Sequence, residues 1–368
     1  MMYYSLHTDS IVVDSHCDTP LRLVEGKDIV KRSDDGHFDL ERMKMGKVTA
    51  SFFAIYTPNT LTPDQATARA LSMIAQIYDF IEKNSHIVSL GRYPKDAYEL
   101  RAESKLAIFL GMENGAPIQK DISMLKLFYR LGVRYLTLTH ADNNEICDSC
   151  SAHAPRWNGL SQFGKEVVKE MNKLGMMIDV SHISDASFYD VLKYSTAPVV
   201  ATHSCCRALC DVPRNISDQM IKDLAEKNGV IQINFYPAFL DKKYAEAFKP
   251  LSNRLEELKM LTKQDPVKYE SLYKEAEAEM TSLKTPSYRA VIDHIDHVVS
   301  LVGSNYVGLG SDFDGIETTP RGLESIADMP IITKELMKRG YSERSIRNIL
   351  GVNFLRAFAA CMKTSYQS

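Results

Sequence analysis

The chain has 368 residues, of which 45% are hydrophobic and 25% charged, and its formal net charge is −3. This is the composition of an ordinary globular protein, and the lack of a basic excess argues against nucleic acid as a partner. No apolar run reaches the roughly 18 residues that a membrane-spanning helix needs. A chain of this length suits one large α/β barrel or two smaller domains.

Alternating strand and helix patterns run along the chain. Helical periodicity marks residues 63–83, 161–174 and 218–227, with Ser161 and Ser217 as N-caps. Continuous apolar character of the strand candidates favours parallel strands that are covered on both faces. Eight such repeats predict a (β/α)8 TIM barrel, an α/β fold. The predicted strands are residues 11–14, 49–56, 106–110, 134–138, 176–180, 198–201, 230–234 and 306–310.

Residues 239–290, after the seventh predicted strand, interrupt the alternation of strands and helices. They are rich in Lys, Glu and Leu and are much longer than a barrel crossover requires. We interpret them as two or three inserted surface helices, a solvated decoration or a dimer contact rather than a catalytic lid. The position after a strand's carboxyl end keeps the lid hypothesis open. No repeat or flexible linker is visible, so residues 1–368 are expected to form a single domain.

The two ends and the cysteines bear on where the protein works. The N-terminal segment MMYYSLHTDS lacks the features of a signal peptide, and AACMKTSYQS is too short and polar for an anchor tail. Seven cysteines without a secretory signal favour reduced thiols. We therefore expect a cytoplasmic protein with no membrane anchor. Cys147 and Cys150 form a single CxxC, which favours a structural role, although they follow His140 closely enough to shape a pocket.

Polar residues follow the predicted strands at the edge where barrel enzymes place their chemistry. The first strand leads into DSHCDTP, where His16 and Asp18 are two residues apart and would share a face. Buried charges are costly unless they are paired or bind a metal, so a convergence of imidazoles and carboxylates favours a metal site. The strand-end residues are His16, Asp18, Glu113, His140, His182, His203, Asp312 and Asp314.

The number of candidate ligands favours two metals. One open catalytic zinc usually takes three protein ligands and water, and this set is larger. Glu113 comes from a strand between the other ligand groups, so it is the bridge candidate. Two metals ~3.5–4 Å apart can hold a hydroxide between them and polarise a carbonyl. The candidate ligands are His16, Asp18, Glu113, His182 and His203.

These motifs, in this order, resemble the membrane (renal) dipeptidases, peptidase family M19, of the metal-dependent amidohydrolase superfamily. The resemblance extends over nearly the whole chain. It implies a barrel, two zinc ions, and hydrolysis of dipeptides, including some with a D-residue at the C-terminal position. A homodimer is compatible with it. The matching stretches include DSHCDTP, GMENG, RYLTLTH, LGMMIDVSH, ATHSCCRALCDVPRNISD and VGLGSDFDG.

The resemblance also implies roles for single residues. His16 and Asp18 match the ligands of one zinc, and His182 and His203 match those of the other. Glu113 matches the bridge. For the reaction itself, the matching residues are Asp312, which handles the proton, His140, which contacts substrate and stabilises the oxyanion, Arg214, which binds substrate, and Tyr236 and Tyr56, which line the pocket.

Two other functions remain in view. Another amidohydrolase, acting on N-acyl amino acids or cyclic amides, would be expected to carry HxH on the first strand and a lysine on the fourth. A barrel that only binds ligands would be expected to lack a metal ligand. At the level of residues, strand alternation leaves open whether Asp314 joins Asp312 in the site. Asp14 and Asp179 could orient histidines or serve as structural hydrogen-bond acceptors, and His294 and His297 are expected to be structural.

Overall fold

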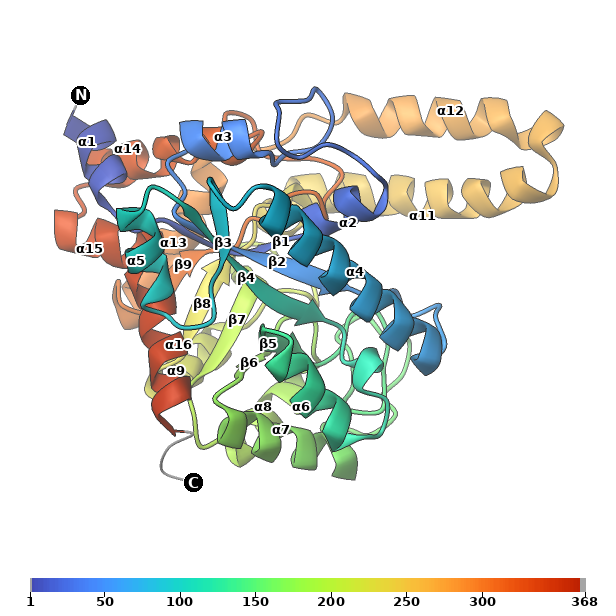
Figure 1. The fold of residues 1–368 in the computed structure, drawn as a ribbon. Coiled ribbons are helices and arrows are strands. Elements are labelled where there is room, and N and C mark those ends of the chain that lie inside the picture. Colours follow the sequence, from blue (N-terminus) through green and yellow to red (C-terminus); the bar gives the residue numbers. More distant parts are fainter. Residues whose placement is uncertain (1, 365–368) are drawn as a thin grey trace.

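The computed structural model describes residues 2–364 and contains a nearly closed barrel of parallel strands surrounded by helices (Figure 1). The predicted (β/α)8 fold is confirmed. A short additional strand, β3 (Val88–Leu90), pairs only with β4. The barrel strands, in the order in which they pair, are β1 (Val13–Cys17), β2 (Ala50–Tyr56), β4 (Leu106–Glu113), β5 (Val133–Thr137), β6 (Met177–Asp179), β7 (Val199–Ser204), β8 (Val230–Ile233) and β9 (Val307–Leu309).

The barrel closes between its first and last strands. Cys17 and Phe313 form a parallel bridge, and the Asp18 amide donates to the Phe313 carbonyl at 2.8 Å. The Asp312 amide donates to the His16 carbonyl at 3.0 Å. These bonds place two motifs with candidate site residues, DSHCD and SDFDG, side by side at one end of the barrel.

Several predicted strand ends need correction. The third predicted strand stopped at residue 110, but β4 continues to Glu113. The sixth stopped at residue 201, but β7 continues to Ser204. The first was placed at residues 11–14, whereas β1 spans Val13–Cys17. In β1 and β7 polar residues interrupt the apolar run although the backbone stays extended, and in β4 the run is interrupted by Gly111. The strand β3 was missed because three residues give too short a pattern.

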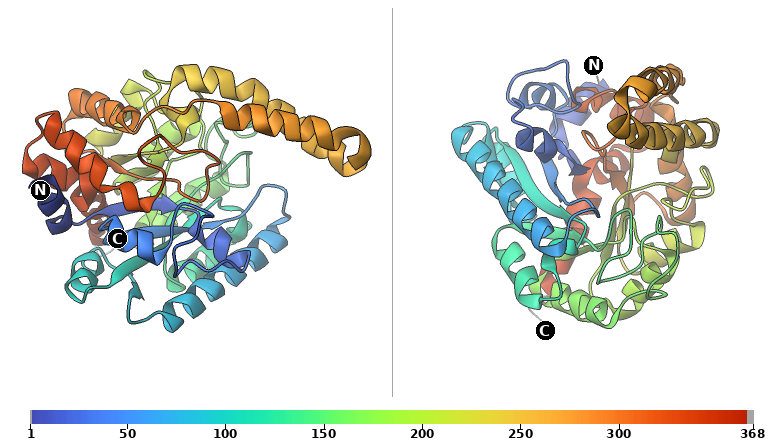
Figure 2. Two further views of the ribbon diagram at one scale, coloured as in Figure 1. Left: turned by 90° about the horizontal axis from the view of Figure 1, so that it is seen from above. Right: turned by 90° about the vertical axis from the view of Figure 1, so that its right-hand side faces the viewer.

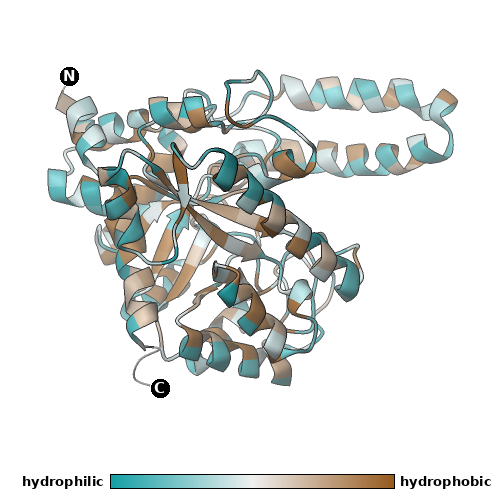
Figure 3. Ribbon diagram, viewed as in Figure 1, coloured by the Kyte–Doolittle hydropathy of each residue, from teal (hydrophilic) through white to brown (hydrophobic). Residues whose placement is uncertain are grey.

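Helices cover the outside of the barrel, and their apolar faces point inward (Figures 2 and 3). The predicted helix at residues 63–83 is α4, and the predicted caps Ser161 and Ser217 accept hydrogen bonds from the first turns of α7 and α9. The helices outside the insertion are α1 (Met2–Asp9), α2 (Thr19–Val24), α3 (Leu40–Met45), α4 (Pro63–Lys83), α5 (Asp96–Ala102), α6 (Ile122–Arg130), α7 (Gln162–Leu174), α8 (Asp185–Tyr194), α9 (Asp218–Glu226), α13 (Arg289–Val302), α14 (Pro330–Lys338), α15 (Glu343–Arg347) and α16 (Asn353–Thr364).

An aromatic stack fills the interior of the barrel. The Phe52 ring lies 4.7 Å from that of Phe109 and 5.7 Å from that of Tyr135, measured between centroids. Phe354 of α16 closes the lower end with an edge-on contact to Phe52 at 5.1 Å. Gly111 makes room for the stack, because a Cβ at this position would lie 2.0 Å from the Tyr135 ring. The stack is therefore a fixed floor beneath the carboxyl ends of the strands.

The insertion predicted at residues 239–290 is helical. It contains α10 (Pro237–Leu240), α11 (Lys242–Gln264) and α12 (Pro266–Ser282). The last two pack against each other as a long hairpin that extends beyond the barrel (Figure 1). The base of the hairpin packs on the barrel through Tyr244 and Phe248. Within residues 2–364, no helix combines the length and hydrophobicity that crossing a membrane requires.

Candidate active site

Two histidines of the site lie at irregular positions of their strands. The pairing register of β1 shifts between Asp14 and Cys17, around His16, and that of β7 shifts between Ala201 and Ser204, around His203. Such irregularities re-aim side chains and are common beside active sites. Here the two imidazoles stack with their centroids 3.7 Å apart. The sequence prediction that these residues converge is supported by this contact.

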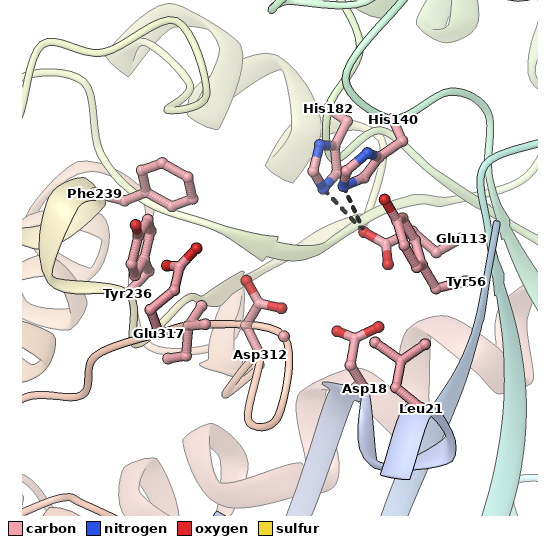
Figure 4. Close-up of a pocket in the computed structure, with 12 residues that line it drawn as sticks. Asp18, Leu21, Tyr56, Glu113, His140, His182, Tyr236, Phe239, Asp312 and Glu317 are labelled. Atoms are coloured by element: carbon pink, nitrogen blue, oxygen red, sulfur yellow. Dashed lines mark ion pairs between the residues drawn. The ribbon is translucent and has the colours of Figure 1, made fainter. Parts of the chain in front are cut away.

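Glu113 lies at the centre of the cluster and directs its two oxygens to different neighbours (Figure 4). Its Oε2 lies 3.6 Å from His16 Nε2. Its Oε1 lies 3.0 Å from His182 Nε2, 3.4 Å from His203 Nε2 and 3.7 Å from His140 Nε2. The two oxygens of this carboxylate thus face different histidines, as expected of a group that is shared between two metal sites.

Two further carboxylates complete the His16 side of the cluster. Asp18 Oδ2 lies 3.3 Å and Asp312 Oδ1 lies 3.8 Å from His16 Nε2. Asp18 is outside the strand, at the start of α2, so its approach to His16 comes from the turn and not from the strand alternation that the sequence suggested. His16 Nε2 is buried and has no hydrogen-bond partner among the described residues.

Burial and neighbouring charges shift the pKa values of the residues in the cluster. Burial, followed by the charge of Glu113, raises the pKa of Asp18 well above its usual value. Burial also raises the pKa of Asp312. Burial alone would lower the pKa of His16, but Glu113 and Asp18 outweigh it and raise that pKa. Burial and then neighbouring positive charge lower the pKa of His203 and of His182, which keeps these imidazoles neutral.

A chain of hydrogen bonds behind His203 selects its tautomer. Asp179 Oδ2 accepts from the hydroxyls of Thr137 at 2.5 Å and Thr202 at 2.6 Å. Because the single hydroxyl proton of Thr202 goes to Asp179, Thr202 can only accept from His203 Nδ1, 2.8 Å away. His203 then carries its proton on Nδ1 and presents the lone pair of Nε2 to the cluster.

Similar contacts support the other site residues. Tyr135, at the top of the aromatic stack, lies 2.7 Å from His16 Nδ1 through its hydroxyl. Asp14, the second acid that could have oriented a histidine, instead accepts from the amide and hydroxyl of Ser311 at 2.8 and 2.6 Å. Asp14 therefore fixes the β9 end rather than an imidazole.

The two acids of DFDG have different surroundings. Asp312 lines the cavity and accepts from the side-chain amide of Asn234 at 2.8 Å. Asp314 points away and accepts from the Thr19 hydroxyl at 2.8 Å and the His37 amide at 2.6 Å. The alternative that the sequence left open is resolved: only Asp312 of the pair lines the cavity.

Two adjoining cavities open over the cluster, and they differ in charge. The acidic cavity, of about 240 Å³, is lined by the carboxylates of Asp18, Glu113, Asp312 and Glu317 (Figure 4). The basic cavity, of about 400 Å³, is lined by Arg214 and Lys249. Among the described residues, no Lys or Arg lines the first and no Asp or Glu lines the second. The side chains common to both are His140, His182, Tyr236 and Phe239.

The predicted substrate-binding residues lie around these cavities. Arg214 is 6% exposed and donates to the Ser204 hydroxyl at 2.8 Å and the His203 carbonyl at 2.7 Å, while its Nε has no partner. Tyr56 contacts the His140 ring edge-on at 4.9 Å. Burial, followed by the charge of Glu113, raises the pKa of Tyr56 to about 12. Its hydroxyl is therefore neutral at physiological pH.

Sequence reasoning missed two residues of the site, Asn234 behind the cavity wall and Glu317 in it. Asn234 binds Asp312 and also accepts from the Tyr236 amide at 2.6 Å. It ends the seventh predicted strand, so the rule that found the histidines could have found it. Glu317 lines the acidic cavity, and its charge adds to the burial that raises the pKa of Tyr236. It lies in an irregular loop, where no sequence periodicity marks it.

The remaining motifs lie outside the cavities. Cys150 is half-buried, and its amide donates to the His182 carbonyl at 2.8 Å. The Ser149 hydroxyl donates to the His140 carbonyl at 2.5 Å. The CDSC segment therefore fixes the backbone of both histidines without lining either cavity. His294 and His297 do not form a pair, because each has a different structural partner.

The donor set fits divalent metal ions. Three overlapping groups each bring their ligand atoms within 4.8 Å of one another, and Glu113 belongs to two of them. Imidazole and carboxylate together suit zinc, and divalent cations would compensate the buried acids and take the place of a proton on His16 Nε2. The groups are His16 with Glu113 and His203, Glu113 with His140 and His182, and His16 with Asp18 and Asp312.

Comparison with known proteins gives consistent matches along the chain. The family described as Membrane dipeptidase (Peptidase family M19) matches residues 2–368. Dipeptidase verJ of Clonostachys rogersoniana is 33% identical over 339 residues, which cover 89% of this chain and 77% of that protein. Dipeptidase 3 of Mus musculus is 31% identical over 364 residues, which cover 96% of this chain and 65% of that protein.

Solved structures agree with these matches. The probable dipeptidase PvdM from Pseudomonas aeruginosa superposes with a TM-score of 0.86 at 28% identity, covering 99% of this chain and 98% of that one. A metallo peptidase from Rhodobacter sphaeroides, liganded with a phosphinate mimic of the dipeptide L-Ala-D-Ala, has a TM-score of 0.78 at 25% identity. That alignment covers 96% of this chain and 99% of the other.

Proposed function

This chain belongs to peptidase family M19, the membrane dipeptidases, and from that membership we propose its reaction in detail: hydrolysis of dipeptides, L,D dipeptides included, at two zinc ions bridged by Glu113. The family and its named relatives are metallodipeptidases. The number and kind of ions and the tolerance for a D-residue are the proposed part. The ligand of the Rhodobacter sphaeroides protein, a mimic of L-Ala-D-Ala, motivates the latter.

The observation that carries the proposal is the division of the cleft by charge. A free dipeptide has an ammonium group at one end and a carboxylate at the other. The acidic cavity suits the ammonium group and the basic cavity suits the carboxylate. His140 and His182 line both cavities, so a dipeptide aligned in this way has its peptide bond over the cluster. The acidic cavity, at about 240 Å³, is smaller than the roughly 300–1,000 Å³ of drug-sized pockets.

The metals would be held by five side chains. His16 and Asp18 would hold one ion and His182 and His203 the other, with Glu113 shared between the two. When bound, zinc supplies Lewis acidity and lowers the pKa of water to about 7. This set lacks the HxH and lysine that were expected of other amidohydrolases.

The remaining residues bind substrate and move protons. Arg214 has a planar fork of donors that suits the terminal carboxylate. His140 donates a hydrogen bond to the oxygen of the attacked carbonyl, an interaction whose loss in another hydrolase costs about 2.7–4 kcal/mol. Asp312, positioned by Asn234, accepts the proton of the attacking water and delivers it to the leaving amine. Tyr56 and Tyr236 form walls of the pocket.

The test is a substrate panel assayed with zinc and with chelator. We expect cleavage of L-Ala-L-Ala and L-Ala-D-Ala, abolished by chelation and restored by zinc. Acetylation of the amino end or amidation of the carboxyl end should each lower kcat/KM roughly tenfold to a hundredfold, because each removes a charged hydrogen bond. Metal analysis should give two ions per chain. Faster cleavage of N-acetylalanine than of the free dipeptides would favour the N-acyl amino acid hydrolase instead.

A variant of Arg214 tests the orientation of the substrate. Arg214→Met should raise KM for L-Ala-L-Ala far more than for its C-terminal amide. The matched control is Arg207→Met, because Arg207 forms a bidentate pair with Asp185 at 2.7 Å beside a separate cavity. An equal effect of Arg214→Met on the free and the amidated substrate would contradict carboxylate binding by this residue.

A further inference from the structure

The first half of α11 forms one wall of the basic cavity. Asp241 caps this helix by accepting from the Tyr244 amide at 2.8 Å. The Tyr244 hydroxyl lies 3.1 Å from that of Thr318, and the Phe248 ring packs edge-on against Tyr236 at 5.7 Å. Because Tyr236 also lines the acidic cavity, α11 is fixed on the rim of the site itself.

One face of α11 supplies this wall. The residues that line the cavity recur at the spacing of a single helical face, and they are Ala245, Phe248, Lys249, Ser252 and Asn253. Arg214, on the barrel side of the cavity, can bind the terminal carboxylate of a substrate. A cavity of about 400 Å³ leaves room beyond that carboxylate for the side chain of the C-terminal residue, which would then face α11.

Lys249 gives this wall a positive charge. It is exposed at the cavity edge, and in the described part of the chain no carboxylate forms an ion pair with it. Its neighbour Glu246 is directed to Lys242, at 3.9 Å. The ammonium group of Lys249 is therefore available to a ligand, and no acid lines the basic cavity to repel an anion.

We propose that Lys249 makes this enzyme selective for dipeptides whose C-terminal residue is acidic, aspartate or glutamate. Arg214 holds the terminal carboxylate, and Lys249 pairs with the side-chain carboxylate across the width of the cavity. The inference rests on the proposed dipeptidase function and assigns the inserted helix a role in specificity. Because the pair is near the surface, its effect is moderate, and we expect about a fivefold preference.

The experiment compares kcat/KM for Ala-Glu, its neutral isostere Ala-Gln, Ala-Lys and Ala-Ala with the zinc-loaded enzyme. The wild type should favour Ala-Glu over Ala-Gln about fivefold, and added salt should reduce this ratio. Lys249→Met should bring the ratio to about one, and Lys249→Glu should make Ala-Lys the better substrate. The matched control, Lys263→Met, lies further along α11 and does not line the cavity, so its ratios should equal those of the wild type.

The outcomes separate this inference from the function on which it rests. Cleavage of Ala-Ala with equal rates for Ala-Glu and Ala-Gln would overturn the role of Lys249 and leave the dipeptidase intact. A preference for Ala-Glu that survives in both Lys249 variants would also overturn it. A failure of the wild type to cleave any of the four dipeptides would overturn the proposed function, and this inference with it.

Discussion

At the scale of single residues, Thr202 positions His203, because the hydroxyl proton of Thr202 is already donated to Asp179. Thr202 donates to Asp179 and so accepts from His203 Nδ1, which leaves Nε2 free to bind a metal. Partners of this kind set the tautomer and ring orientation of a ligand, and their loss typically weakens metal binding 10–100-fold. Thr137 makes the same bond to Asp179 but does not contact a histidine.

This difference allows a paired test. Thr202→Val should weaken zinc binding by roughly tenfold or more, since His203 loses the acceptor that holds its Nδ1 proton. Thr137→Val removes one bond from the same carboxylate and should have a smaller effect. Zinc affinity, measured by competition with a chromophoric chelator, distinguishes the two. Equal losses in both variants would show that only the Asp179 network matters and not the tautomer.

The sequence predicted the residues that converge but not those that support them. His16, Glu113 and His203 could be found because a polar residue after an apolar run marks a strand end. Tyr135 and Thr202 lie inside strands, where an aromatic or hydroxyl side chain is ordinary. Their roles depend on register and on which face they occupy, and a single sequence does not specify either.

At the scale of elements, the aromatic stack in the barrel and the metal cluster above it form one column. Tyr135 belongs to both, since its ring packs on Phe52 and its hydroxyl reaches His16. Gly111 of β4 is the neighbour that allows this position, and any Cβ there would overlap the ring. The geometry of the site is therefore coupled to the packing of the strands below it.

Two substitutions separate these contributions. Gly111→Ala should displace Tyr135, lower the free energy of unfolding by about 1–3 kcal/mol through overpacking, and weaken zinc binding. Tyr135→Phe removes only the hydroxyl, so zinc binding should weaken while stability changes much less. Denaturant unfolding and chelator competition measure the two quantities. Native zinc affinity in Gly111→Ala would contradict the coupling between stack and site.

The errors in the predicted strand ends have a common physical origin. Register irregularities surround His16 and His203, and polar ligands replace apolar residues there. A strand predicted from hydrophobicity alone therefore ends before the candidate metal ligands, although the hydrogen-bonded backbone of the strand continues past this point. The α4 prediction at residues 63–83 was more accurate, because a Thr62–Gln65 capping box and a long amphipathic pattern mark that helix locally.

At the scale of the whole molecule, His294 links three separate parts of the fold. Its ring is buried in α13, accepts from the Cys206 amide after β7 and donates to the Leu240 carbonyl of α10, each at 3.0 Å. Burial is the main cause that lowers its pKa to about 4, from an ordinary value of 6.5. A proton on Nδ1 would face the N–H of Cys206, so the hydrogen bond that this amide donates to Nδ1 would be lost.

The stability of the fold should consequently depend on pH through this residue. Below pH 6.5 the unfolded chain takes up a proton that the folded chain resists until about pH 4, so stability is lost as pH falls through this range. The loss between pH 7.5 and 4.5 is about 2.5 kcal/mol for this single group. Denaturant unfolding of His294→Gln should show a pH dependence smaller by about this amount. Parallel profiles for both proteins would contradict the assignment.

The fold class could be predicted from the sequence, because eight alternations of strand and helix admit few arrangements. The placement of the insertion could not. Its composition predicts surface helices, and most of the hairpin is exposed, but the packing of Phe248 on Tyr236 is a tertiary contact without a sequence signal. A segment that the sequence favours as decoration therefore lines the basic cavity with its first turns.

The outer part of the hairpin is a suitable place to attach a label or a tag. The α11 residues that touch the cavity end at Asn253, and the turn at Asp265 lies ~16 Å or more further along the helix axis. Met260 and Val267 near this turn are 65% and 99% exposed. A fluorophore, an affinity tag or a fused partner attached there would protrude into solvent. The enzyme could then be immobilised or tracked without obstruction of the acidic and basic cavities.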